Sequence, residues 1–339
     1  MKAVNLTRTG KPSVLTVTDL PEPLPKKGEV RVNLEYAGIN FAEILSRKGL
    51  YGWAPKRPYI LGMEGSGTID KTGEGVDATL VGKKVVVGAQ YGCYSQKICV
   101  PASQAVPAMD HLSMEENAAL LVNYATAWVS LMELGRLQKG ERVLITAAAG
   151  GVGTAAIQLA TAMECKVYGL AGSDEKIKLI KSLGAQGGFN YRDAAWHQAM
   201  RNTVGKTDLV LEMVGGDVYK RCYESLDYFG RIVVVGYASL DIKLWNPMSW
   251  WRAWRGIPRM DIMDAAERSV AVMSSHLGYL LPDQVKMQEI VGRMYAFISG
   301  KNIKPVIGEI FTLENVQQAH VLVESRRSTG KVLLKIPQD

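Results

Sequence analysis

Predicted strands alternate with amphipathic segments through the central part of the chain. The strands are expected at residues 143–145, 166–170, 209–211 and 232–235. The last two are continuous apolar runs, which are typical of strands buried on both faces of a parallel sheet. Helical patterns separate the strands at residues 173–183, 194–204 and 219–226. This alternation predicts a doubly wound α/β domain, which we place at residues 123–265.

The two ends of the chain carry a different pattern. Before the central domain, short runs at residues 14–17, 29–34, 67–71 and 83–88 are separated by turns rich in Pro and Gly. This spacing predicts a mainly antiparallel, partly barrel-like domain. After it, we expect a helix, a strand, a helix and a strand at residues 282–299, 307–311, 314–324 and 331–336. This segment is small, so we expect residues 266–339 to complete the domain formed by residues 1–122, with the substrate cleft between the two domains.

A turn of small residues follows the first strand of the central domain. Ala148, Gly150 and Gly153 occupy the three positions of a Gly-x-Gly-x-x-Gly pattern, and an apolar helix pattern follows at once. Small residues let the backbone approach a pyrophosphate, and the amides of the helix N-terminus point at the anion. We therefore predict a Rossmann-type dinucleotide site in which Ala148, Gly150, Gly151, Val152 and Gly153 contact the phosphates.

Composition narrows the possible classes of protein. The chain has 339 residues, which suits two domains, and 47% of them are apolar. No uncharged apolar run approaches the ~20 residues of a membrane-spanning helix, and the first residues do not resemble a signal peptide. Four scattered cysteines fit a reducing cytoplasm. A net charge of +7 over this length is too small to indicate nucleic acid as a partner.

Several stretches together resemble the medium-chain dehydrogenase/reductase superfamily, in its zinc-less quinone oxidoreductase branch. The stretches are residues 38–42, 62–67, 147–153, 190–192 and 330–334. Residues 120–124, 276–280 and the Trp pair at 250–251 are also similar to the synaptic-vesicle amine-transport-protein-like group. The resemblance implies a GroES-like domain beside the Rossmann-type domain, and a hydride-transferring enzyme. By analogy with relatives, residues 270–274 would pair across a two-fold axis in a homodimer.

The residues at the family's metal positions argue against zinc. Zinc-dependent relatives use Cys at the position that resembles Asn40, and their Gly-His-Glu stretch reads Gly62-Met63-Glu64 here. No Cys-x-x-Cys occurs, and Cys93 and Cys99 are spaced more widely than usual zinc ligand pairs. We therefore predict no metal, and we expect Glu64 to be a structural or hydrogen-bonding carboxylate rather than an acid catalyst.

The end of the second strand favours NADPH over NADH. Enzymes that select NADH place an acid there for the ribose hydroxyl, whereas this chain has Ala171. Ser173, Lys176 and Tyr191, with Arg192 adjacent, are expected to meet the 2′-phosphate of NADPH. The two acidic residues after Ser173 count against a phosphate, although they also stabilise a helix N-terminus. Lys176 could instead belong to a solvated helix face.

Little covalent machinery is needed when a cofactor carries the hydride. By resemblance, Asn40 and Thr126 approach the nicotinamide end, and Tyr51 could donate a proton or hydrogen bond to a substrate carbonyl. Tyr51 could equally be a packing residue, and a lone histidine such as His276 is more often structural. The loops after the strands supply the other candidate cofactor contacts, and the resemblance adds Lys331. These contacts are Val214, Gly236, Tyr237, His276, Leu277 and Lys331.

A segment rich in Trp and Arg spans residues 245–259. On a helix its tryptophans and its arginines would lie on different flanks; they include Trp250, Trp251, Trp254, Arg252 and Arg255. Three interpretations remain open. The tryptophans could pack on the domain or at a dimer contact, cover the substrate cleft, or anchor the protein peripherally at a membrane surface.

These observations lead to one principal hypothesis and two alternatives. We expect an NADPH-dependent, zinc-independent enzyme that transfers hydride to a quinone or a conjugated carbonyl such as an enone. An enoyl-thioester reductase is a close variant. The alternative from another class is a nucleotide-binding interaction protein, or a peripheral membrane protein, that keeps the reductase fold.

Overall fold

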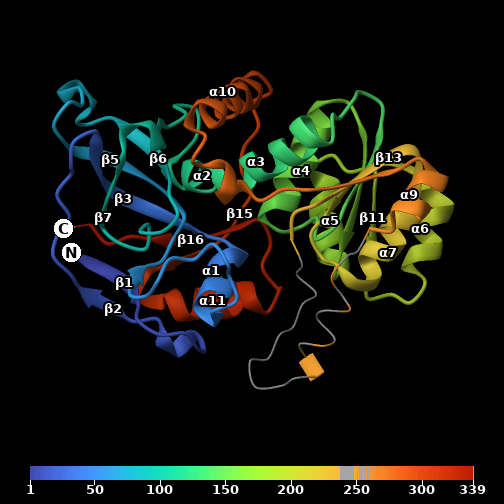
Figure 1. Ribbon diagram of the computed structural model, residues 1–339, viewed down its shortest axis with the longest axis horizontal. Coiled ribbons are helices and arrows are strands. Elements are labelled where there is room, and N and C mark those ends of the chain that lie inside the picture. The colour runs from blue at the N-terminus through green and yellow to red at the C-terminus, as the bar shows by residue number, and fades with distance from the viewer. Residues whose placement is uncertain (237–247, 250, 252–254, 256, 258–259, 339) are drawn as a thin grey trace. The chain divides into compact units, whose positions relative to one another are not determined.

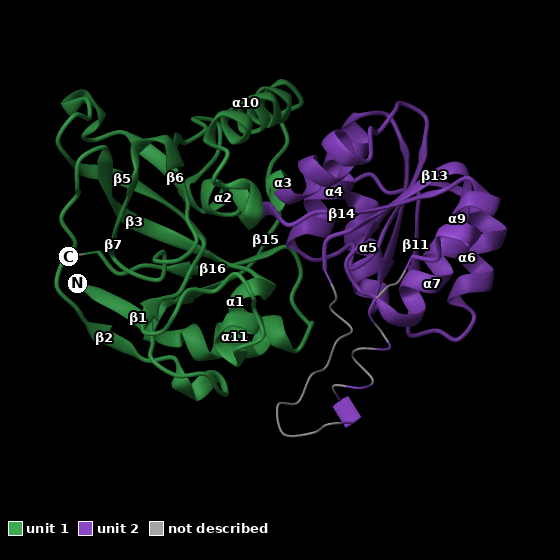
Figure 2. Cartoon of the chain, viewed as in Figure 1, with its two compact units in different colours: residues 1–125, 278–339 green, residues 126–277 purple. Residues whose placement is uncertain are grey.

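The chain folds into two compact units. The computed structural model describes residues 1–236, 248–249, 251, 255, 257 and 260–338. Unit 1 comprises Met1–Ala125 and Gly278–Asp339, and unit 2 comprises Thr126–Leu277 (Figure 2). The sequence placed the boundaries earlier, at residues 122/123 and 265/266. They differ because Asn123 contacts Lys331 of unit 1, whereas Ala271–Ser274 pairs with a strand of unit 2.

Unit 2 contains a parallel sheet that has six strands in the described part of the chain. The strands are β9 (Arg142–Ile145), β10 (Lys166–Ala171), β11 (Gly187–Asn190), β12 (Thr207–Glu212), β13 (Leu226–Val234) and β14 (Ala271–Ser274). Their spatial order is β11-β10-β9-β12-β13-β14, so the first strand of the unit lies in the middle. Figure 1 labels β11 and β13 of this sheet. This is the order of a dinucleotide-binding Rossmann-type sheet, in which ligands bind outside the carboxyl ends of the central strands.

Helices cover the parallel sheet of unit 2. They are α3 (Leu121–Trp128), which begins in unit 1, a π-helical turn η4 (Val129–Leu134), α4 (Gly151–Ala162), α5 (Asp174–Ser182), α6 (Trp196–Val204), α7 (Gly216–Glu224) and α9 (Ile262–Arg268). Met200 of α6 and Tyr219 of α7 pack on Leu144, Leu170 and Val210 of the strands. Because both surfaces of these strands are apolar, the continuous apolar runs in the sequence are explained.

Unit 1 is built mainly from antiparallel strands, as the sequence predicts. Its largest sheet follows the path β15-β16-β3-β5-β6-β8, with β7 paired to β3, and a smaller one has the order β2-β1-β4 within the described residues. The strands are β1 (Lys2–Leu6), β2 (Val17–Asp19), β3 (Glu29–Ile39), β4 (Tyr59–Ile60), β5 (Glu64–Thr72), β6 (Lys84–Gly88), β7 (Lys97–Pro101), β8 (Ala105–Pro107), β15 (Ile307–Thr312) and β16 (Lys331–Lys335). Together the units give the expected GroES-like and Rossmann-type architecture.

The helices of unit 1 are short, except for one near the C-terminus. The α-helices are α1 (Phe41–Lys48), α2 (Met114–Ala118), α10 (Gln284–Gly300) and α11 (Val316–Glu324). Single 3₁₀ turns are η1 (Pro12–Val14), η2 (Ala78–Leu80), η3 (Ala102–Gln104), η5 (Leu277–Leu280) and η6 (Leu313–Asn315). Val332 of β16 pairs with Ile39 of β3, so the C-terminal segment extends the sheet of the N-terminal segment.

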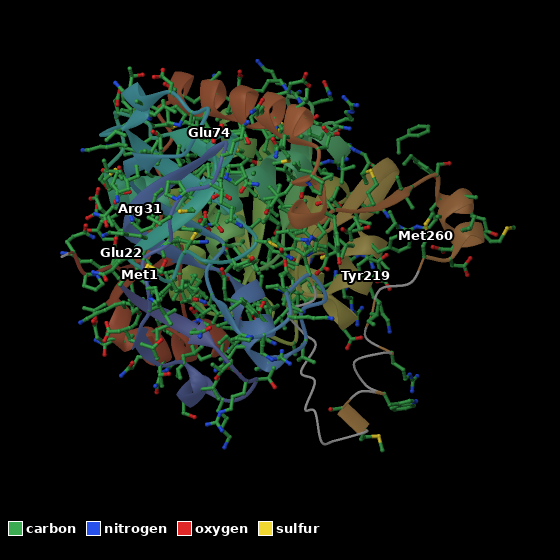
Figure 3. All side chains as sticks on the ribbon, turned by 60° about the vertical axis from the view of Figure 1, so that its left-hand side comes forward. Met1, Glu22, Arg31, Glu74, Tyr219 and Met260 are labelled. Atoms are coloured by element: carbon green, nitrogen blue, oxygen red, sulfur yellow. The ribbon has the colours of Figure 1, made fainter. Side chains whose placement is uncertain are left out.

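Buried charges in the main sheet of unit 1 are paired with each other. Arg31 of β3 is almost fully buried, and its guanidinium donates to Asp70 at 2.8 Å and to Glu22 at 3.1 Å. Arg31 and Glu22 are labelled in Figure 3. Both partners are carboxylates, which raise the pKa of Arg31 against the opposing effect of burial. The charge is therefore stabilised within its own sheet.

Several predicted elements differ from the observed ones, since β13 begins at Leu226 rather than 232 and β3 extends to Ile39 rather than 34. Residues 14–17 were expected to form a strand, but Pro12 starts the turn η1 and the strand begins only at Val17. The helix expected at residues 219–226 runs from Gly216 to Glu224. It starts earlier because Gly215 and Gly216 adopt positive φ angles of 82° and 59°, and it ends earlier because Leu226 pairs with Thr207.

Among the described residues, no helix combines the length and apolar character that crossing a membrane requires.

Candidate functional site

The glycine-rich turn of unit 2 joins β9 to α4. Gly150 is the residue before the helix, and Gly151, Val152 and Gly153 form its first turn. A Cβ atom on Gly153 would lie 2.5 Å from the carbonyl oxygen of Ala147 and 2.6 Å from Ala148, so only glycine lets the helix pack this closely on the turn. The first amides of a helix have no partner within the helix. The turn therefore offers amide donors to an anion at the carboxyl end of the central strand.

Polar and basic side chains gather where β10 and β11 end. Ala171 and Asn190 are paired in these parallel strands, so the residues that follow each strand lie next to each other. A Cβ atom on Gly172 would lie 2.7 Å from the hydroxyl of Tyr191 and 3.5 Å from Nε of Arg192. Ser173 is the N-cap of α5 and accepts a hydrogen bond from the amide of Lys176 at 3.4 Å. One point beyond the ends of β10 and β11 is thus surrounded by Gly172, Ser173, Tyr191 and Arg192.

The charges at this point suit a doubly negative ligand. The pKa of Lys176 is lowered by partial burial and by the positive charge of Arg192. Ala171, at the end of β10, contributes no carboxylate. Asp174, one of the two acids that counted against a phosphate, accepts a hydrogen bond from Asn190 at 3.5 Å. A phosphate between the ammonium and the guanidinium would relieve their mutual repulsion through charge-assisted hydrogen bonds.

A buried carboxylate that the sequence did not single out holds the loop after β12. Glu212 is fully buried and accepts hydrogen bonds from the amides of Val214 at 2.8 Å and Gly215 at 2.9 Å. The hydroxyl of Thr146 accepts from the amide of Met213 at 2.8 Å. Burial raises the pKa of Glu212, and these hydrogen bonds oppose that shift. The position of Val214 is thereby fixed beside the central strands.

The other predicted cofactor contacts of unit 2 belong to different elements. Thr126 lies in α3, and its carbonyl accepts a hydrogen bond from Ser130 at 2.7 Å. His276 and Leu277 follow β14, and the pKa of His276 is lowered by partial burial. Ser130 and Ser275 share a hydrogen bond of 3.4 Å, which ties the loop after β14 to the helical turn η4. Gly236 follows β13, whereas Tyr237 lies outside the described residues.

The Trp–Arg segment is described only in part. Trp250, Arg252 and Trp254 lie outside the described residues. Trp251 is 51% exposed, and the guanidinium of Arg255 lies over its ring at 4.8 Å from the centroid. We expected tryptophans and arginines on different flanks, but Trp251 and Arg255 lie on the same side. They are four positions apart, and a cation–π contact joins them.

In unit 1, Asn40 is the centre of a buried polar network. It is the residue before α1, and its backbone amide donates to Glu43 at 2.8 Å. Its side-chain oxygen accepts from the ammonium of Lys331 at 2.6 Å, and its side-chain nitrogen donates to Glu64 at 3.2 Å. The ammonium of Lys331 also contacts Asn123 at 3.5 Å. Both ends of the Asn40 amide are thus held by neighbouring side chains.

Glu43 is a second functional candidate that the sequence analysis missed. It is fully buried, and it also accepts a hydrogen bond from the amide of Met63 at 3.0 Å. Burial raises the pKa of Glu43 to about 7, although the charge of Lys331 and the amide of Asn40 oppose the shift. The available signal was the capping-box pattern, in which an Asn is followed three residues later by Glu at a helix start.

Tyr51 belongs to a row of aromatic rings in the same unit. The rings of Tyr51 and Trp53 meet edge to face at 6.4 Å, and those of Trp53 and Tyr279 at 6.5 Å. Gly278 touches Trp53 so closely that a Cβ atom there would lie 2.7 Å from the indole. The Tyr51 hydroxyl is protonated at neutral pH, as in any tyrosine, and can act as a hydrogen-bond donor; burial raises its pKa further.

Comparison with known proteins identifies the family. Residues 151–287 match the family of zinc-binding dehydrogenases, and residues 26–110 match the alcohol dehydrogenase GroES-like domain. The chain is 33% identical to the human synaptic vesicle membrane protein VAT-1 homolog over 315 residues, which covers 92% of this chain and 80% of that protein. It is 36% identical to bovine quinone oxidoreductase-like protein 2 over 320 residues, covering 93% of this chain and 87% of that protein.

Solved structures agree with this assignment. Quinone oxidoreductase of Escherichia coli, complexed with NADPH, is 26% identical and superposes with a TM-score of 0.87, covering 99% of this chain and 100% of that chain. The quinone oxidoreductase of Thermus thermophilus, also solved in complex with NADPH, is 31% identical with a TM-score of 0.82 and the same coverage. The chain belongs to the medium-chain dehydrogenase/reductase family, and its relatives include quinone oxidoreductases and VAT-1 homologues.

Proposed function

We propose that this protein is an NADPH-dependent oxidoreductase that reduces a quinone or a conjugated carbonyl without a metal. The observation that carries the proposal is the arrangement of Lys176, Tyr191 and Arg192 around Gly172 and Ser173, at a strand end that lacks an acid. A 2′-phosphate fits two cations and a helix N-terminus, whereas a ribose hydroxyl alone needs an acidic acceptor. The NADPH complexes of two quinone oxidoreductases similar to this chain support the same cofactor.

The roles proposed for the chain follow from its hydrogen bonds. The nicotinamide cofactor, when bound, supplies a hydride, and a proton completes the two-electron reduction of a carbonyl. Tyr51 donates a hydrogen bond to the oxygen that gains negative charge, because a phenol is protonated at neutral pH and burial raises its pKa further. Asn40 and Thr126 remain the residues proposed for the nicotinamide end. The other proposed cofactor contacts are Val214, Gly236, Tyr237, His276, Leu277 and Lys331.

Titration with both reduced coenzymes tests this proposal. We expect NADPH to quench the intrinsic fluorescence at lower concentration than NADH, since only NADPH carries the phosphate. Oxidation of NADPH is then followed against quinones, enones and enoyl thioesters, which separates the proposed reaction from its thioester variant. Equal affinity for the two coenzymes would contradict the cofactor assignment, and binding without turnover of any acceptor would contradict the enzyme assignment.

A peripheral membrane role is the second candidate, and the exposure of Trp251 favours it. An indole more than half exposed, with the guanidinium of Arg255 stacked on it, suits the interfacial zone of a bilayer. Flotation with anionic liposomes tests this role. We expect Trp251→Ala to abolish flotation while NADPH oxidation persists. A parent protein that does not float would remove the idea.

Two further proposals concern assembly and location. In the described part of unit 2, β14 is the last strand in the sheet order, so its outer edge is available for pairing in a homodimer. Light scattering of the purified protein measures the mass directly.

All four cysteines are free thiols, which supports a proposed place in the reducing cytoplasm.

A further inference from the structure

We propose that the ammonium group of Lys331 is the fixed cation of unit 1, at the position where zinc-binding relatives hold their metal. We further infer that it orients Asn40, a role that rests on the proposed reductase function. The zinc-binding family match raises the question of a metal. The side chains of Asn40, Glu64 and Asn123 answer it, because their oxygens surround an ammonium that belongs to the chain itself.

The ammonium lies in a cage of oxygen atoms. Lys331 is 2% exposed and Glu64 is 0% exposed. The Nζ atom donates to Glu64 Oε1, to Asn40 Oδ1 at 2.6 Å and to Asn123 Oδ1 at 3.5 Å. An ammonium has three donors and no acceptor, so one carboxylate and two amide oxygens match its hydrogen-bonding capacity. The cage therefore needs no further cation.

The carboxylate of Glu64 is fully engaged inside unit 1. Its Oε1 accepts from Lys331 and, at 3.2 Å, from the side-chain nitrogen of Asn40. Its Oε2 accepts from the backbone amide of Val122 at 2.8 Å. Both oxygens thus have donors within unit 1, and a metal would have to displace them before it could bind.

The residues present do not fit zinc. Zinc takes thiolate, imidazole or carboxylate ligands, whereas this chain offers an amide at Asn40, a thioether at Met63 and a carboxylate paired with an ammonium. Among the described residues, no three His, Cys, Asp or Glu side chains form a group that could hold a metal ion. A divalent cation would also be repelled by the buried charge of Lys331.

The position of the ammonium determines which way the Asn40 amide points. Its oxygen faces Lys331, and its nitrogen faces Glu64. The reversed amide would place its NH₂ group against the ammonium and its oxygen against a carboxylate, so both contacts would become repulsive. Gly38 makes room for this arrangement, because a Cβ atom there would lie 2.6 Å from Cε of Lys331. Lys331 is accordingly a positioning residue that acts through Asn40.

The first experiment measures cation binding without turnover. The parent protein is dialysed against Co²⁺, whose visible absorption reports tetrahedral coordination, and we expect no stoichiometric uptake.

In Lys331→Ala, a series of alkylammonium ions is added and the melting temperature is followed. We expect an ammonium of matching length to raise it, and the same salt to leave the parent and the matched control Lys335→Met unchanged. Stoichiometric Co²⁺ bound by the parent and lost in Glu64→Gln would overturn the proposal, as would an absence of any alkylammonium effect on a folded Lys331→Ala.

The second experiment measures the positioning role. Because Lys331→Ala leaves a buried carboxylate without its partner, the double variant Lys331→Met/Glu64→Gln removes both charges and preserves the fold. We expect kcat/KM of the double variant to fall about 10- to 100-fold, mainly through kcat, because the Asn40 amide loses its orientation. Parental kcat/KM in this variant would overturn the role of Lys331. A parent protein that neither binds nor oxidises NADPH would instead contradict the proposed function, and the cation measurements above would still stand as a separate test.

Discussion

Lys331 of unit 1 and the pair Lys176 and Arg192 of unit 2 are positive charges in opposite surroundings. In unit 1 the ammonium of Lys331 is enclosed by oxygens of Asn40, Glu64 and Asn123. In unit 2 the pKa of Lys176 is lowered by burial and by another cation, Arg192. A cation enclosed by acceptors of its own chain stabilises and orients its neighbours, whereas two adjacent cations are stabilised by an anion from outside. Lys331 is therefore a charge that stabilises the structure, whereas Lys176 and Arg192 are charges that can bind a ligand.

Removing the enclosed cation should have the largest effect. In Lys331→Met the carboxylate of Glu64 stays buried without its ion-pair partner. Breaking a buried pair in this way costs about 3–5 kcal/mol of unfolding free energy. We expect urea denaturation to show this loss for unit 1.

The double variant Lys331→Met/Glu64→Gln provides the control for that experiment. It removes the unpaired charge, so a substantial part of the lost stability should return. If the single variant were as stable as the parent, the ion pair would contribute nothing, and the contrast between the two units would disappear.

A buried neutral histidine in unit 1 links stability to pH. His320 of α11 is fully buried, its ring meets that of Tyr94 edge to face at 5.9 Å, and neither ring nitrogen has a hydrogen-bond partner among the described residues. Burial, together with the charge of Arg47, lowers the pKa of His320 from 6.5 to about 3. Because the folded state disfavours the proton, stability is full above pH 6.5 and is lost as the pH falls toward 3.

The size of this pH effect follows from the shift. Between pH 8 and pH 5, the histidine should reduce the unfolding free energy by about 2 kcal/mol. Urea denaturation of the parent and of His320→Leu at both pH values measures it, since the difference between the two proteins cancels the other titrating groups. An equal pH dependence of the two proteins would show that His320 is not buried in its neutral form.

The fold was predictable from sequence because its signals are local. Continuous apolar runs marked β12 and β13, and the small residues Ala148, Gly150 and Gly153 marked the turn into α4. The absence of an acidic residue at position 171, where the chain has Ala171, was equally evident from the sequence. The start of α7 was missed because it depends on the positive φ angles of Gly215 and Gly216, which the apolar pattern does not record.

The polar network of unit 1 was less predictable because its members are far apart in sequence. Asn40 and Lys331 are separated by nearly the whole chain and meet only because β16 pairs with β3. Glu43 and Glu212 are single carboxylates whose importance comes from complete burial, and burial of one acid leaves no pattern in a sequence. The residues missed are therefore single buried acids, whereas long-range pairing hid only the contact between Asn40 and Lys331.

The smallest predicted effect is also the most specific one, and it concerns the cations of unit 2. Lys176→Ala removes an ammonium near Arg192, so the affinity for NADPH should fall about tenfold, the value expected for one charge-assisted hydrogen bond. NADH should bind as in the parent because it has no 2′-phosphate. Lys178→Ala is the matched control, since Lys178 is an exposed lysine of the same helix. A general weakening of the helix would lower the affinity for both coenzymes in both variants, whereas loss of a phosphate contact lowers only the affinity of Lys176→Ala for NADPH. Equal losses for NADPH and NADH in Lys176→Ala would mean that the cations of unit 2, like the ammonium of unit 1, serve the structure alone.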